Sequence, residues 1–566
     1  MAAATLPSES TSTMKYIIIG AVAGGASTAA RLRRMDEHAE IIIFEKGEYI
    51  SYANCGLPYY IGNVIKDRNK LFVQTAASFH QRFNIDIRVQ TEVTAIDPTA
   101  KKVTAKDQRT GEVYEESYDK LVLSPGAEPI RPPLQGIINE GIFTLRNVND
   151  TDYIKSYVQQ KNVKKAVVIG AGFIGLEMAE SLHGLGLHVS IIEMGNQILA
   201  PVDFPIAAIV QQHIRSKNVD LRLNSTVTSF TKVADQLKVH LKSGDVIDAD
   251  VIILSIGVKP DTRLAAAAGL KIGDAKGIWV NEYLQTSDPD IYAVGDAIEF
   301  KNPITQQTMI TYLAGPANKQ GRICANNMVL GNLQQYHGSI NTAIVKVFDM
   351  TVATAGTASK HLTAASIKHI VSTTHNGSHA GYYPGAKQMS IQIAFSPEDG
   401  RLYSAQIAGF DGVDKRIDIL SSAIKRGSSI YELAEFEHAY APPYSSAKDP
   451  INMAGFVAEN ILLKRLHVFY WNELENKSKD GLLIDVRRAD EFAAGNIAGA
   501  INIPVDEIRE RITEIPKDQH IYIYCEAGLR GYLAQRILLQ NGYGQVSNLS
   551  GGFYLWNICK NELSKA

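Results

Sequence analysis

The chain has 566 residues, of which 45% are hydrophobic and 20% are charged, and its net charge is −2. This length exceeds what one hydrophobic core can organise and predicts roughly four domains. The balanced charge argues against nucleic acid or anionic membranes as partners, and no apolar run is long enough to span a bilayer. Four cysteines are too few for a secreted disulfide framework, so we expect a reducing, cytoplasmic location.

The first thirteen residues, MAAATLPSESTST, lack basic residues and a long apolar run. Residues 1–13 are therefore predicted to be a disordered extension and not a signal peptide.

A dinucleotide-binding pattern begins directly after this extension. Residues 15–20 predict a strand, residues 20–35 a turn and a helix, and residues 40–46 a second strand that carries Glu45. Glycines in such a turn let a pyrophosphate approach the helix N-terminus, and the acidic residue accepts hydrogen bonds from ribose hydroxyls. Val22 replaces the middle glycine of GxGxxG, so this first motif is incomplete.

The pattern recurs, complete, in residues 165–194, with Gly170, Gly172 and Gly175 in the turn and Glu193 at the end of the second strand. Two such units in one chain are difficult to explain by chance. No arginine or histidine near Glu193 could receive a 2′-phosphate, whereas its carboxylate can accept a hydrogen bond from a free 2′-hydroxyl. We therefore expect NADH rather than NADPH at this unit.

Three further segments follow the same order as in a known family. Residues 118–129 and 251–262 predict strands that end in turns, and residues 286–299 place Asp296 at a strand end beside a glycine. With the two units, these segments resemble the pyridine nucleotide–disulfide oxidoreductase family over residues 14–455. The resemblance implies an α/β fold with two dinucleotide-binding, three-layer, glutathione-reductase-like domains, followed by an α+β dimerisation domain that forms a homodimer.

The resemblance also implies FAD on the first unit and NADH on the second. The implied FAD-binding residues are Gly20, Gly24, Gly25, Glu45, Lys46, Val93, Ser124 and Asp296. The implied NADH-binding residues are Gly170, Gly172, Gly175, Glu193 and Gly257.

The end of the chain predicts a small α/β module with its own cysteine. Segments 481–504, 520–543 and 549–556 resemble a single rhodanese domain. The predicted boundaries are 14–130 with 261–330 for the FAD-binding domain, 131–260 for the NADH-binding domain, 335–455 for the dimerisation domain, 456–478 for a helical linker and 479–566 for the rhodanese domain.

Cys55 lies in SYANCGLPYY (51–60), and no second cysteine follows until Cys324. A redox dithiol therefore cannot form within this segment, and a mixed disulfide with a small thiol must carry the redox step. An unperturbed cysteine thiol has a pKa near 8.5, and we expect a helix start at CGLPYYIG, together with the flavin, to favour the thiolate. A buried structural cysteine is the alternative. The segment resembles coenzyme A disulfide reductases, in which one cysteine forms a mixed disulfide with CoA.

That resemblance extends to HAGYYPGA (379–386) and HAYAPPYSSAKDP (438–450), which would reach the active site from the partner subunit. It implies Tyr382 and Tyr440 as catalytic residues beside Cys55. The implied CoA-binding residues are Ser27, Arg31, Arg34, Ser51, Asn54 and Lys448. For the two arginines, an exposed helix face is the alternative interpretation.

In the rhodanese-like module, Cys525 ends a predicted strand and precedes Arg530 and an amphipathic helix over 532–541. Backbone N–H groups of such a loop converge on the sulfur, so a persulfide is the expected occupant. The loop residues are Glu526, Gly528 and Arg530. The negative charge of Glu526 argues against thiosulfate and leaves neutral or carrier-bound persulfides as donors. An inactive, regulatory module is the alternative.

These patterns predict an FAD-dependent reductase that uses NADH to reduce CoA persulfide, polysulfide or CoA disulfide and releases hydrosulfide, while the rhodanese module transfers sulfane sulfur through Cys525. Cys324 and Cys559 are predicted to be spectators, and no metal is expected. One alternative is an NADH oxidase or peroxidase that cycles through a sulfenic acid, although Ala23 stands where peroxidase relatives carry a histidine. Another is a CoA-bound redox sensor or sulfur carrier with negligible turnover.

Overall fold

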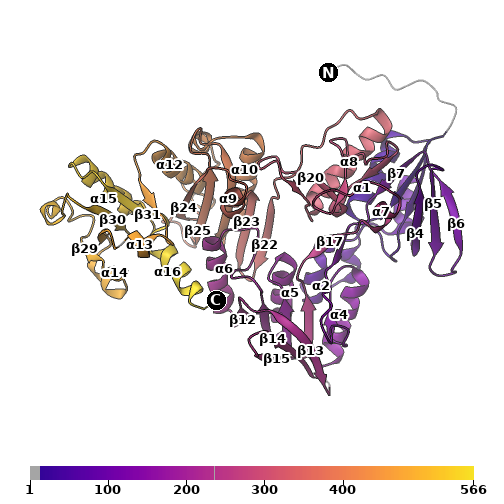
Figure 1. The fold of residues 1–566 in the computed structure, drawn as a ribbon, viewed down its shortest axis with the longest axis horizontal. Helices are drawn as coiled ribbons and strands as arrows, with labels where there is room; N and C mark the ends of the chain where they lie inside the picture. The colour runs from indigo at the N-terminus through magenta and orange to yellow at the C-terminus, as the bar shows by residue number, and fades with distance from the viewer. Residues whose placement is uncertain (1–12, 235, 478, 566) are drawn as a thin grey trace. The chain divides into compact units, whose positions relative to one another are not determined.

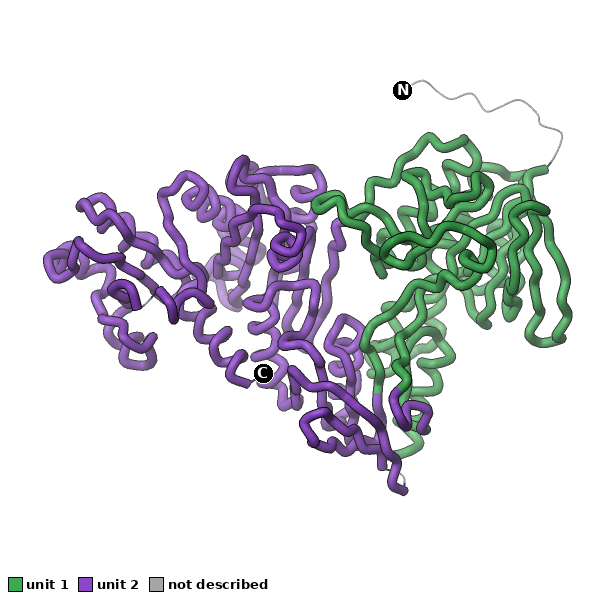
Figure 2. The backbone as a smooth tube through the Cα atoms, in the orientation of Figure 1, with its two compact units in different colours: residues 1–133, 140–163, 253–339 green, residues 134–139, 164–252, 340–566 purple. Residues whose placement is uncertain are grey.

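The computed structural model describes residues 13–234, 236–477 and 479–565, so most of the predicted disordered extension lies outside the described residues. The chain forms two compact units (Figure 2). The first contains residues 1–133, 140–163 and 253–339, and the second contains residues 134–139, 164–252 and 340–566. Within the described ranges, no helix combines the length and the apolar character needed to span a bilayer.

The first unit is built on a five-stranded parallel sheet with strand order β19-β7-β1-β2-β3. Strand β7 of this sheet is labelled in Figure 1. Its strands in chain order are β1 (Lys15–Ile19), β2 (Glu40–Phe44), β3 (Asp86–Arg88), β7 (Lys120–Leu123) and β19 (Ile291–Ala293). In β1 and β2, every residue after the first is buried, which is the pattern of a parallel strand covered on both faces.

Helices and a second sheet complete the first unit. Helix α1 (Ala23–Met35) packs closely on α8 (Ala314–Leu330). The helices are so close that a Cβ atom on Gly321 would lie only 2.6 Å from the carbonyl oxygen of Gly24. An antiparallel sheet contributes buried side chains to the same core. Its strands are β4 (Thr91–Asp97), β5 (Lys102–Asp107) and β6 (Val113–Ser117). The unit also contains α2 (Leu57–Ile61), α3 (Ala76–Phe83), α4 (Val148–Gln160) and α7 (Arg263–Ala267).

The second unit contains another parallel βαβ arrangement, formed by β10 (Lys165–Ile169), α5 (Phe173–Gly184), β11 (His188–Ile192), α6 (Phe204–Ser216) and β12 (Asp220–Arg222). An antiparallel sheet follows, made of β13 (Val227–Val233), β14 (Gln236–Leu241) and β15 (Val246–Ala249).

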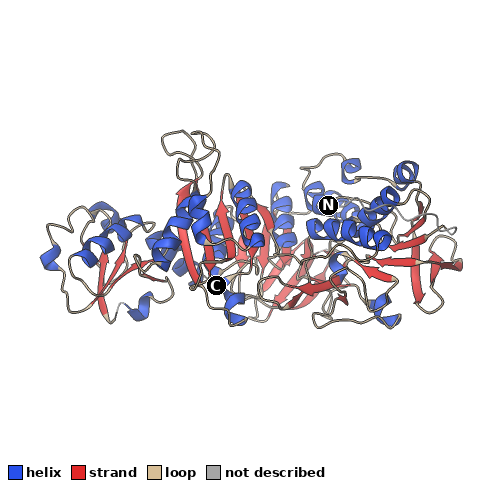
Figure 3. Cartoon of the chain, turned by 90° about the horizontal axis from the view of Figure 1, so that it is seen from above, coloured by secondary structure: helices blue, strands red, loops and turns tan. Residues whose placement is uncertain are grey.

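A five-stranded antiparallel sheet lies at the middle of the second unit, with strand order β22-β23-β26-β25-β24. Its strands are β22 (Ala343–Val347), β23 (Met350–Gly356), β24 (Ile370–Gly377), β25 (Gln388–Phe395) and β26 (Leu402–Gly409). Helix α10 (Val413–Arg426) packs on β23 and β26, and α12 (Pro450–Leu462) packs on β24 (Figure 1). In the view of Figure 3, helices (blue) lie against the strands (red). Two short helices, α9 (Ser359–Ala364) and α11 (Ile430–Glu435), lie in the connections.

The C-terminal module has its own parallel sheet, with strand order β27-β31-β30-β28-β29. Its strands are β27 (Val468–Phe469), β28 (Gly481–Asp485), β29 (Ile501–Asn502), β30 (His520–Tyr524) and β31 (Val546–Leu549). Its helices are α13 (Leu474–Lys477), α14 (Ala489–Ala494), α15 (Leu529–Gln540) and α16 (Gly552–Leu563). Strand β27 lies within the predicted linker 456–478. Because β27 pairs with β31, the sheet of the C-terminal module begins before residue 479.

Side-chain contacts hold this module against the rest of the second unit. Arg215 on α6 pairs with the buried carboxylate of Glu562 on α16, with Nε and Oε2 3.1 Å apart. The rings of Phe204 and Trp471 stack, with centroids 5.4 Å apart. The Tyr470 hydroxyl donates to the carbonyl oxygen of Val371 at 3.1 Å. The C-terminal module is therefore docked on α6 and β24.

Candidate active sites

A cavity of about 790 Å³ in the first unit lies at the carboxyl ends of β1 and β2, a size typical of cofactor sites. Gly20 has φ +96°, and a Cβ atom there would lie 2.1 Å from the carbonyl oxygen of Ser124, so the turn requires glycine. A Cβ atom on Gly25 would lie 1.9 Å from the Gly20 carbonyl oxygen. The predicted FAD residues that line the cavity are Gly20, Gly24, Glu45, Lys46, Val93, Ser124 and Asp296.

The polar groups of this cavity suit a dinucleotide. The Glu45 carboxylate accepts hydrogen bonds from the Ala21 N–H (2.9 Å) and the Gly47 N–H (2.8 Å), which fixes it beside the turn. Burial raises the pKa of Asp296 to about 6, and the nearby Arg146 partly opposes this effect. Asp296 is therefore poised between a carboxylate, which only accepts hydrogen bonds, and a carboxyl group that can also donate.

Arg146 is a cavity residue that the sequence did not reveal. It lines the cavity just before α4, and its buried Nε atom has no hydrogen-bond partner among the described residues. Such an orphaned donor fits an acceptor atom of a bound cofactor. The capping box of Asn147 and Asp150, which marks the start of α4, is the local signal that could have drawn attention to this segment. The residues present therefore fit FAD.

The second dinucleotide turn joins β10 to α5. Gly170 has φ +98°, and a Cβ atom on Gly172 would meet no atom within 4 Å, so the turn is open to a ligand. Glu193 accepts hydrogen bonds from the Ala171 N–H (2.9 Å) and the Gly195 N–H (2.8 Å), as Glu45 does in the first turn. Gly175 is buried within α5, and the predicted residue Gly257 (φ +116°) belongs to the first unit. These features fit a nicotinamide nucleotide.

Cys55 is the exposed member of the four cysteines, none of which forms a disulfide. It sits in a 3-10 turn, Asn54–Gly56, followed by the five-residue helix α2 (Leu57–Ile61). The predicted helix start is therefore present, but a helix this short contributes only a small dipole. The preceding Asn54 lines the FAD-type cavity, and Ser51, with φ 45°, donates its N–H to the carbonyl oxygen of Ala21 at 2.8 Å. The cysteine segment is thus tied to the first turn.

The other cysteines lie in different surroundings. Burial raises the pKa of Cys324 and of Cys559, so both stay protonated thiols at neutral pH. This agrees with the spectator role predicted for them.

The predicted CoA-binding residues of α1 lie beside α8. Arg31 donates from Nε to Oδ1 of Asn326 at 2.8 Å, and its pKa is lowered by burial and by the positive charges of Arg322 and Arg34. The Ser27 hydroxyl contacts Asn318. Three arginines thus concentrate positive charge on these helices, which suits an anionic group. Arg322 was not predicted, because nothing in the sequence pairs α1 with α8. Lys448 is exposed and belongs to the second unit.

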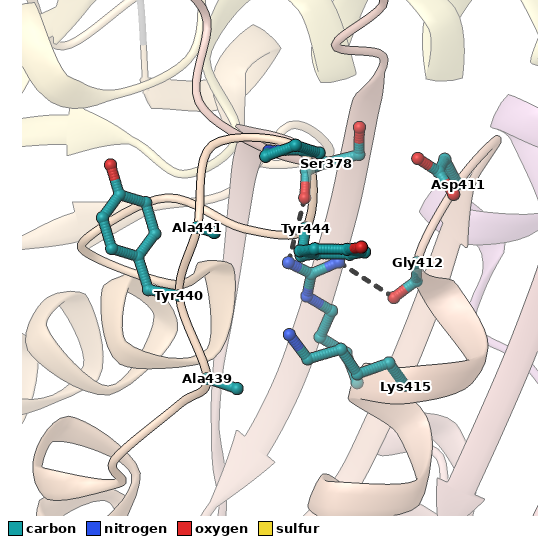
Figure 4. A pocket seen from close by; sticks show the side chains of 10 residues that line it. Ser378, Asp411, Gly412, Lys415, Ala439, Tyr440, Ala441 and Tyr444 are labelled. Carbon is teal, nitrogen blue, oxygen red and sulfur yellow. Dashed lines mark hydrogen bonds between the residues drawn. The ribbon is translucent and has the colours of Figure 1, made fainter. Parts of the chain in front are cut away.

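The two predicted tyrosine segments meet in the second unit. The hydroxyls of Tyr382 and Tyr440 are 2.6 Å apart, and this hydrogen bond raises the pKa of Tyr382. Next to the pair lies a cavity of about 410 Å³, which Tyr440 and Tyr444 line together with Lys415 (Figure 4). The structure therefore brings together two hydroxyls that are 58 residues apart in the chain.

Cys525 directly follows β30 and is buried, and the Gly528 N–H points at its sulfur from 3.1 Å. Gly528 has φ +124°, a conformation that lets this tight loop enter α15. Helix α15 begins at Leu529, earlier than the predicted 532, because the loop itself turns into the helix. A backbone N–H directed at the sulfur suits a thiolate or a persulfide anion.

Charged pairs surround this loop. Both guanidinium Nη atoms of Arg530 donate to Glu491, at 2.6 and 2.8 Å, and this contact lowers the pKa of Glu491 to about 2. Arg487, which the sequence did not reveal, donates from Nη1 to Oε2 of Glu526 at 3.1 Å. Arg487 is already paired with the fully buried Asp485 at 2.8 Å. Two arginines thus face three carboxylates in this cluster. Its net charge is negative, and Glu526 is the carboxylate in excess.

Two family descriptions match the chain. "Pyridine nucleotide-disulphide oxidoreductase" matches residues 14–321, and "Rhodanese-like domain" matches residues 470–559. The coenzyme A disulfide reductase of Staphylococcus haemolyticus is 38% identical over 447 residues, which cover 79% of this chain and 100% of the relative. The chain belongs to the pyridine nucleotide–disulfide oxidoreductase family.

Two solved structures of similar architecture cover nearly the whole chain. The crystal structure of reduced Bacillus anthracis CoADR-RHD superposes with a TM-score of 0.96 at 47% identity, over 98% of this chain and 99% of that one. An NAD-dependent persulfide reductase from A. fulgidus superposes with a TM-score of 0.90 at 38% identity, over 96% and 100%. These matches confirm the predicted α/β fold and the C-terminal rhodanese module.

Membership of this family makes the chain an FAD- and NADH-dependent oxidoreductase with a sulfurtransferase module, as the sequence predicted. The individual site residues and the domain boundaries stay predictions.

Proposed function

We propose that the protein uses NADH to reduce CoA persulfides, and also CoA disulfide, through a mixed disulfide between Cys55 and CoA. The observation that carries this proposal is the exposed Cys55, which directly follows Asn54 in the wall of the FAD-type cavity. The other three cysteines are buried. Since no second thiol lies in the Cys55 segment, the disulfide partner must come from the substrate.

The chemistry at Cys55 is balanced in two steps. The Cys55 thiolate attacks the CoA-bound sulfur of CoA–S–SH, forms Cys55–S–S–CoA, and expels hydrosulfide. Two electrons and one proton then return Cys55 to a thiolate and release CoA as a thiol. FAD, when bound, supplies the two-electron relay from NADH to sulfur. With CoA disulfide as substrate, the first step expels CoA thiolate instead of hydrosulfide.

The other site residues have assigned roles in this proposal. Tyr382 and Tyr440, supplied by the second subunit of a homodimer, orient the sulfur and give a proton to the leaving thiolate. The two hydroxyl oxygens are 2.6 Å apart, so one hydroxyl donates its proton to the other. The hydroxyl that accepts this bond keeps its own proton for the substrate. The CoA contacts expected on α1 are Ser27, Arg31 and Arg34, and those expected shortly after it are Ser51 and Asn54. The basic side chains on α1 suit the phosphates of CoA.

The rhodanese module supplies the persulfide. A Cys525 persulfide passes its outer sulfur to the thiolate of CoA, which yields CoA–S–SH and frees the Cys525 thiolate. The N–H of Gly528, 3.1 Å from the sulfur, stabilises the thiolate in both directions of this exchange. All four cysteines are thiols, which fits a reducing, cytoplasmic setting.

Replacing Cys55 with serine tests the covalent step. The Cys55→Ser protein should keep FAD and still reduce an artificial dye with NADH, but it should lose NADH oxidation that depends on CoA persulfide or CoA disulfide. The matched control is Cys324→Ser, which changes a buried thiol and should keep both activities. Persulfide-dependent turnover in Cys55→Ser would refute the mechanism. A wild-type rate near zero with both substrates would favour a sensor, and a high rate with oxygen or peroxide alone would favour an oxidase or peroxidase.

A further inference from the structure

The two tyrosines lie on separate loops of the second unit. Tyr382 lies on the loop that follows β24, and Tyr440 lies on the loop that connects α11 to α12. Both side chains are exposed, by 75% and 46% respectively. Water competes for hydrogen bonds between exposed hydroxyls, so the contact between the two rings is a weak restraint on their relative position. Buried contacts beneath the loops must therefore fix that position.

Arg416 on α10 makes those buried contacts. Its side chain is 1% exposed, and its Nη2 donates to the carbonyl oxygen of Ser378 at 3.0 Å, on the first loop. The same nitrogen donates to Oγ of Ser445 at 3.3 Å, on the second loop. Nη1 donates to the carbonyl oxygen of Gly412 at 3.1 Å, at the start of α10. Figure 4 shows the bonds that end on Ser378 and Gly412 as dashed lines. One guanidinium thus joins both loops to a helix.

Asp449 completes this arrangement. Its carboxylate lies 2.9 Å from Nη2 of Arg416 and accepts hydrogen bonds from the Ser445 hydroxyl (2.6 Å) and the Ile451 N–H (3.0 Å). Burial alone would raise the pKa of Asp449, but the bonds from Arg416, Ile451 and Ser445 lower it, so the group is ionised. Because Asp449 caps α12, the second loop is held at its end as well.

The ion pair of Arg416 and Asp449 is better suited to holding the two loops in place than to stabilising the folded protein. Desolvation offsets much of the Coulomb attraction of a buried ion pair, so such pairs add little net stability compared with apolar packing. They do fix the groups that they bind, because each donor has one direction. A further backbone bond, from the Ala380 N–H to the carbonyl oxygen of Ser445 at 3.0 Å, joins the loops at the same level. The cavity of about 410 Å³ between α10 and the loops is lined by both Arg416 and Tyr440.

We propose that Arg416, together with Ser445 and Asp449, is a positioning residue for the reductase: it holds the two loops at the separation that brings the hydroxyls of Tyr382 and Tyr440 together. Arg416 touches no reacting atom and acts through the tyrosines. This inference rests on the proposed function for what the tyrosines do.

Two substitutions test the role with different severity. Arg416→Lys keeps the charge but loses the fork of donors, and Ser445→Ala removes one hydroxyl while keeping the ion pair. Misplacing a catalytic group by about 1 Å can cost a factor on the order of 100. We therefore expect Arg416→Lys to lower kcat for CoA persulfide by roughly 10- to 100-fold and Ser445→Ala by a smaller factor. NADH oxidation with an artificial dye, which needs neither tyrosine, should not change.

The matched control is Arg215→Lys, which weakens another pairing with a buried carboxylate, at Glu562, on the side of α6 where α16 docks. It should keep kcat. A double-mutant cycle provides the decisive readout, since residues that act through one group are not additive. Because Arg416 acts through both tyrosines, Arg416→Lys should lower kcat by a smaller factor in the Tyr440→Phe background than in the wild type.

Several outcomes would overturn the proposal. These are a wild-type kcat in Arg416→Lys, additive losses in the cycle with Tyr440→Phe, and an equal loss of dye reduction, which would indicate general damage to the fold. Hydrogen exchange of residues 378–387 and 438–446 gives a second test that does not need activity, because Arg416→Lys should speed exchange in both segments and Arg215→Lys in neither. Exchange rates that stay unchanged in Arg416→Lys would also refute it. Failure of the proposed function itself is seen separately, as an inactive wild-type protein.

Discussion

His375 donates a hydrogen bond from Nε2 to the carbonyl oxygen of Gly551, at 3.1 Å. A carbonyl oxygen can only accept, so this contact assigns the tautomer, and Nδ1 accepts from the hydroxyl of Ser390 at 2.8 Å. Gly551 immediately precedes α16, whose Phe553 N–H donates to the carbonyl oxygen of Cys525 at 2.8 Å. A histidine of the antiparallel sheet thus supports the loop that carries the rhodanese cysteine.

This contact predicts an acid-sensitive interface. Burial lowers the pKa of His375 to about 4, and the bond to Gly551 only partly opposes the effect. Between about pH 6.5 and pH 4 the unfolded chain binds a proton at this histidine that the folded chain does not, so stability falls as the pH falls through this window. The loss should reach about 3 kcal/mol at pH 4.

His375→Gln keeps an N–H donor and removes the titration. Thermal unfolding between pH 7 and pH 4.5 should therefore show a smaller acid-induced drop in Tm for this variant than for the wild type. His369→Gln, which changes a histidine whose Nδ1 contacts only a carbonyl oxygen two residues away, serves as the control and should keep the wild-type acid profile. Parallel acid profiles for wild type and His375→Gln would contradict the prediction.

The charge beside Cys525 predicts which sulfur donors the rhodanese module accepts. Arg487 and Arg530 are matched by Asp485 and Glu491, so the Glu526 carboxylate repels an incoming anion such as thiosulfate. Its side chain is partly exposed, so one charge is worth only about 1 kcal/mol. Glu526→Gln should therefore raise kcat/KM for thiosulfate roughly three- to tenfold at low ionic strength.

Sulfur transfer from thiosulfate to cyanide measures this effect directly. The gain in Glu526→Gln should shrink as salt is added, because screening weakens the repulsion that the substitution removes. Glu510→Gln removes an exposed carboxylate of the same module and should change nothing. A thiosulfate rate in Glu526→Gln that equals the wild-type rate would show that the loop excludes thiosulfate by shape and not by charge.

The second dinucleotide turn predicts a route to NADPH. Glu193 is held beside the turn by the Ala171 and Gly195 N–H groups, and the next side chain, Met194, is 73% exposed. Met194→Arg would place a guanidinium where a 2′-phosphate would lie. We expect kcat/KM for NADPH to rise on the order of tenfold, equal to about 1.4 kcal/mol, while kcat/KM for NADH changes little.

Steady-state kinetics with each nucleotide and a dye acceptor check this result without involving Cys55. Met194→Leu is the control for the loss of methionine and should keep the preference for NADH. If Met194→Arg leaves the NADPH rate unchanged, the ribose does not bind beside Glu193.

The parts of this protein that could be predicted are those that contiguous segments encode. Strand, glycine turn, helix and acidic strand end follow one another within about thirty residues, so both dinucleotide units could be read from local pattern. Cys55 and Cys525 were found for the same reason, since each lies in a short loop between elements that the pattern identifies.

Contacts that join distant segments could be recognised only in the folded chain. Three such contacts link residues on different elements. They are the bond between Tyr382 and Tyr440, the bonds of Arg416 to Ser445 and Asp449, and the contact of His375 with Gly551. Likewise, the missing hydrogen-bond partner of Arg146 Nε could be recognised only from the three-dimensional position of this residue in the cavity wall. Hydrophobic periodicity reports which face of an element is buried, but it does not say which other element covers that face. Arg416 shows the consequence: its charge predicts an exposed residue, and only packing against two loops explains why it is buried.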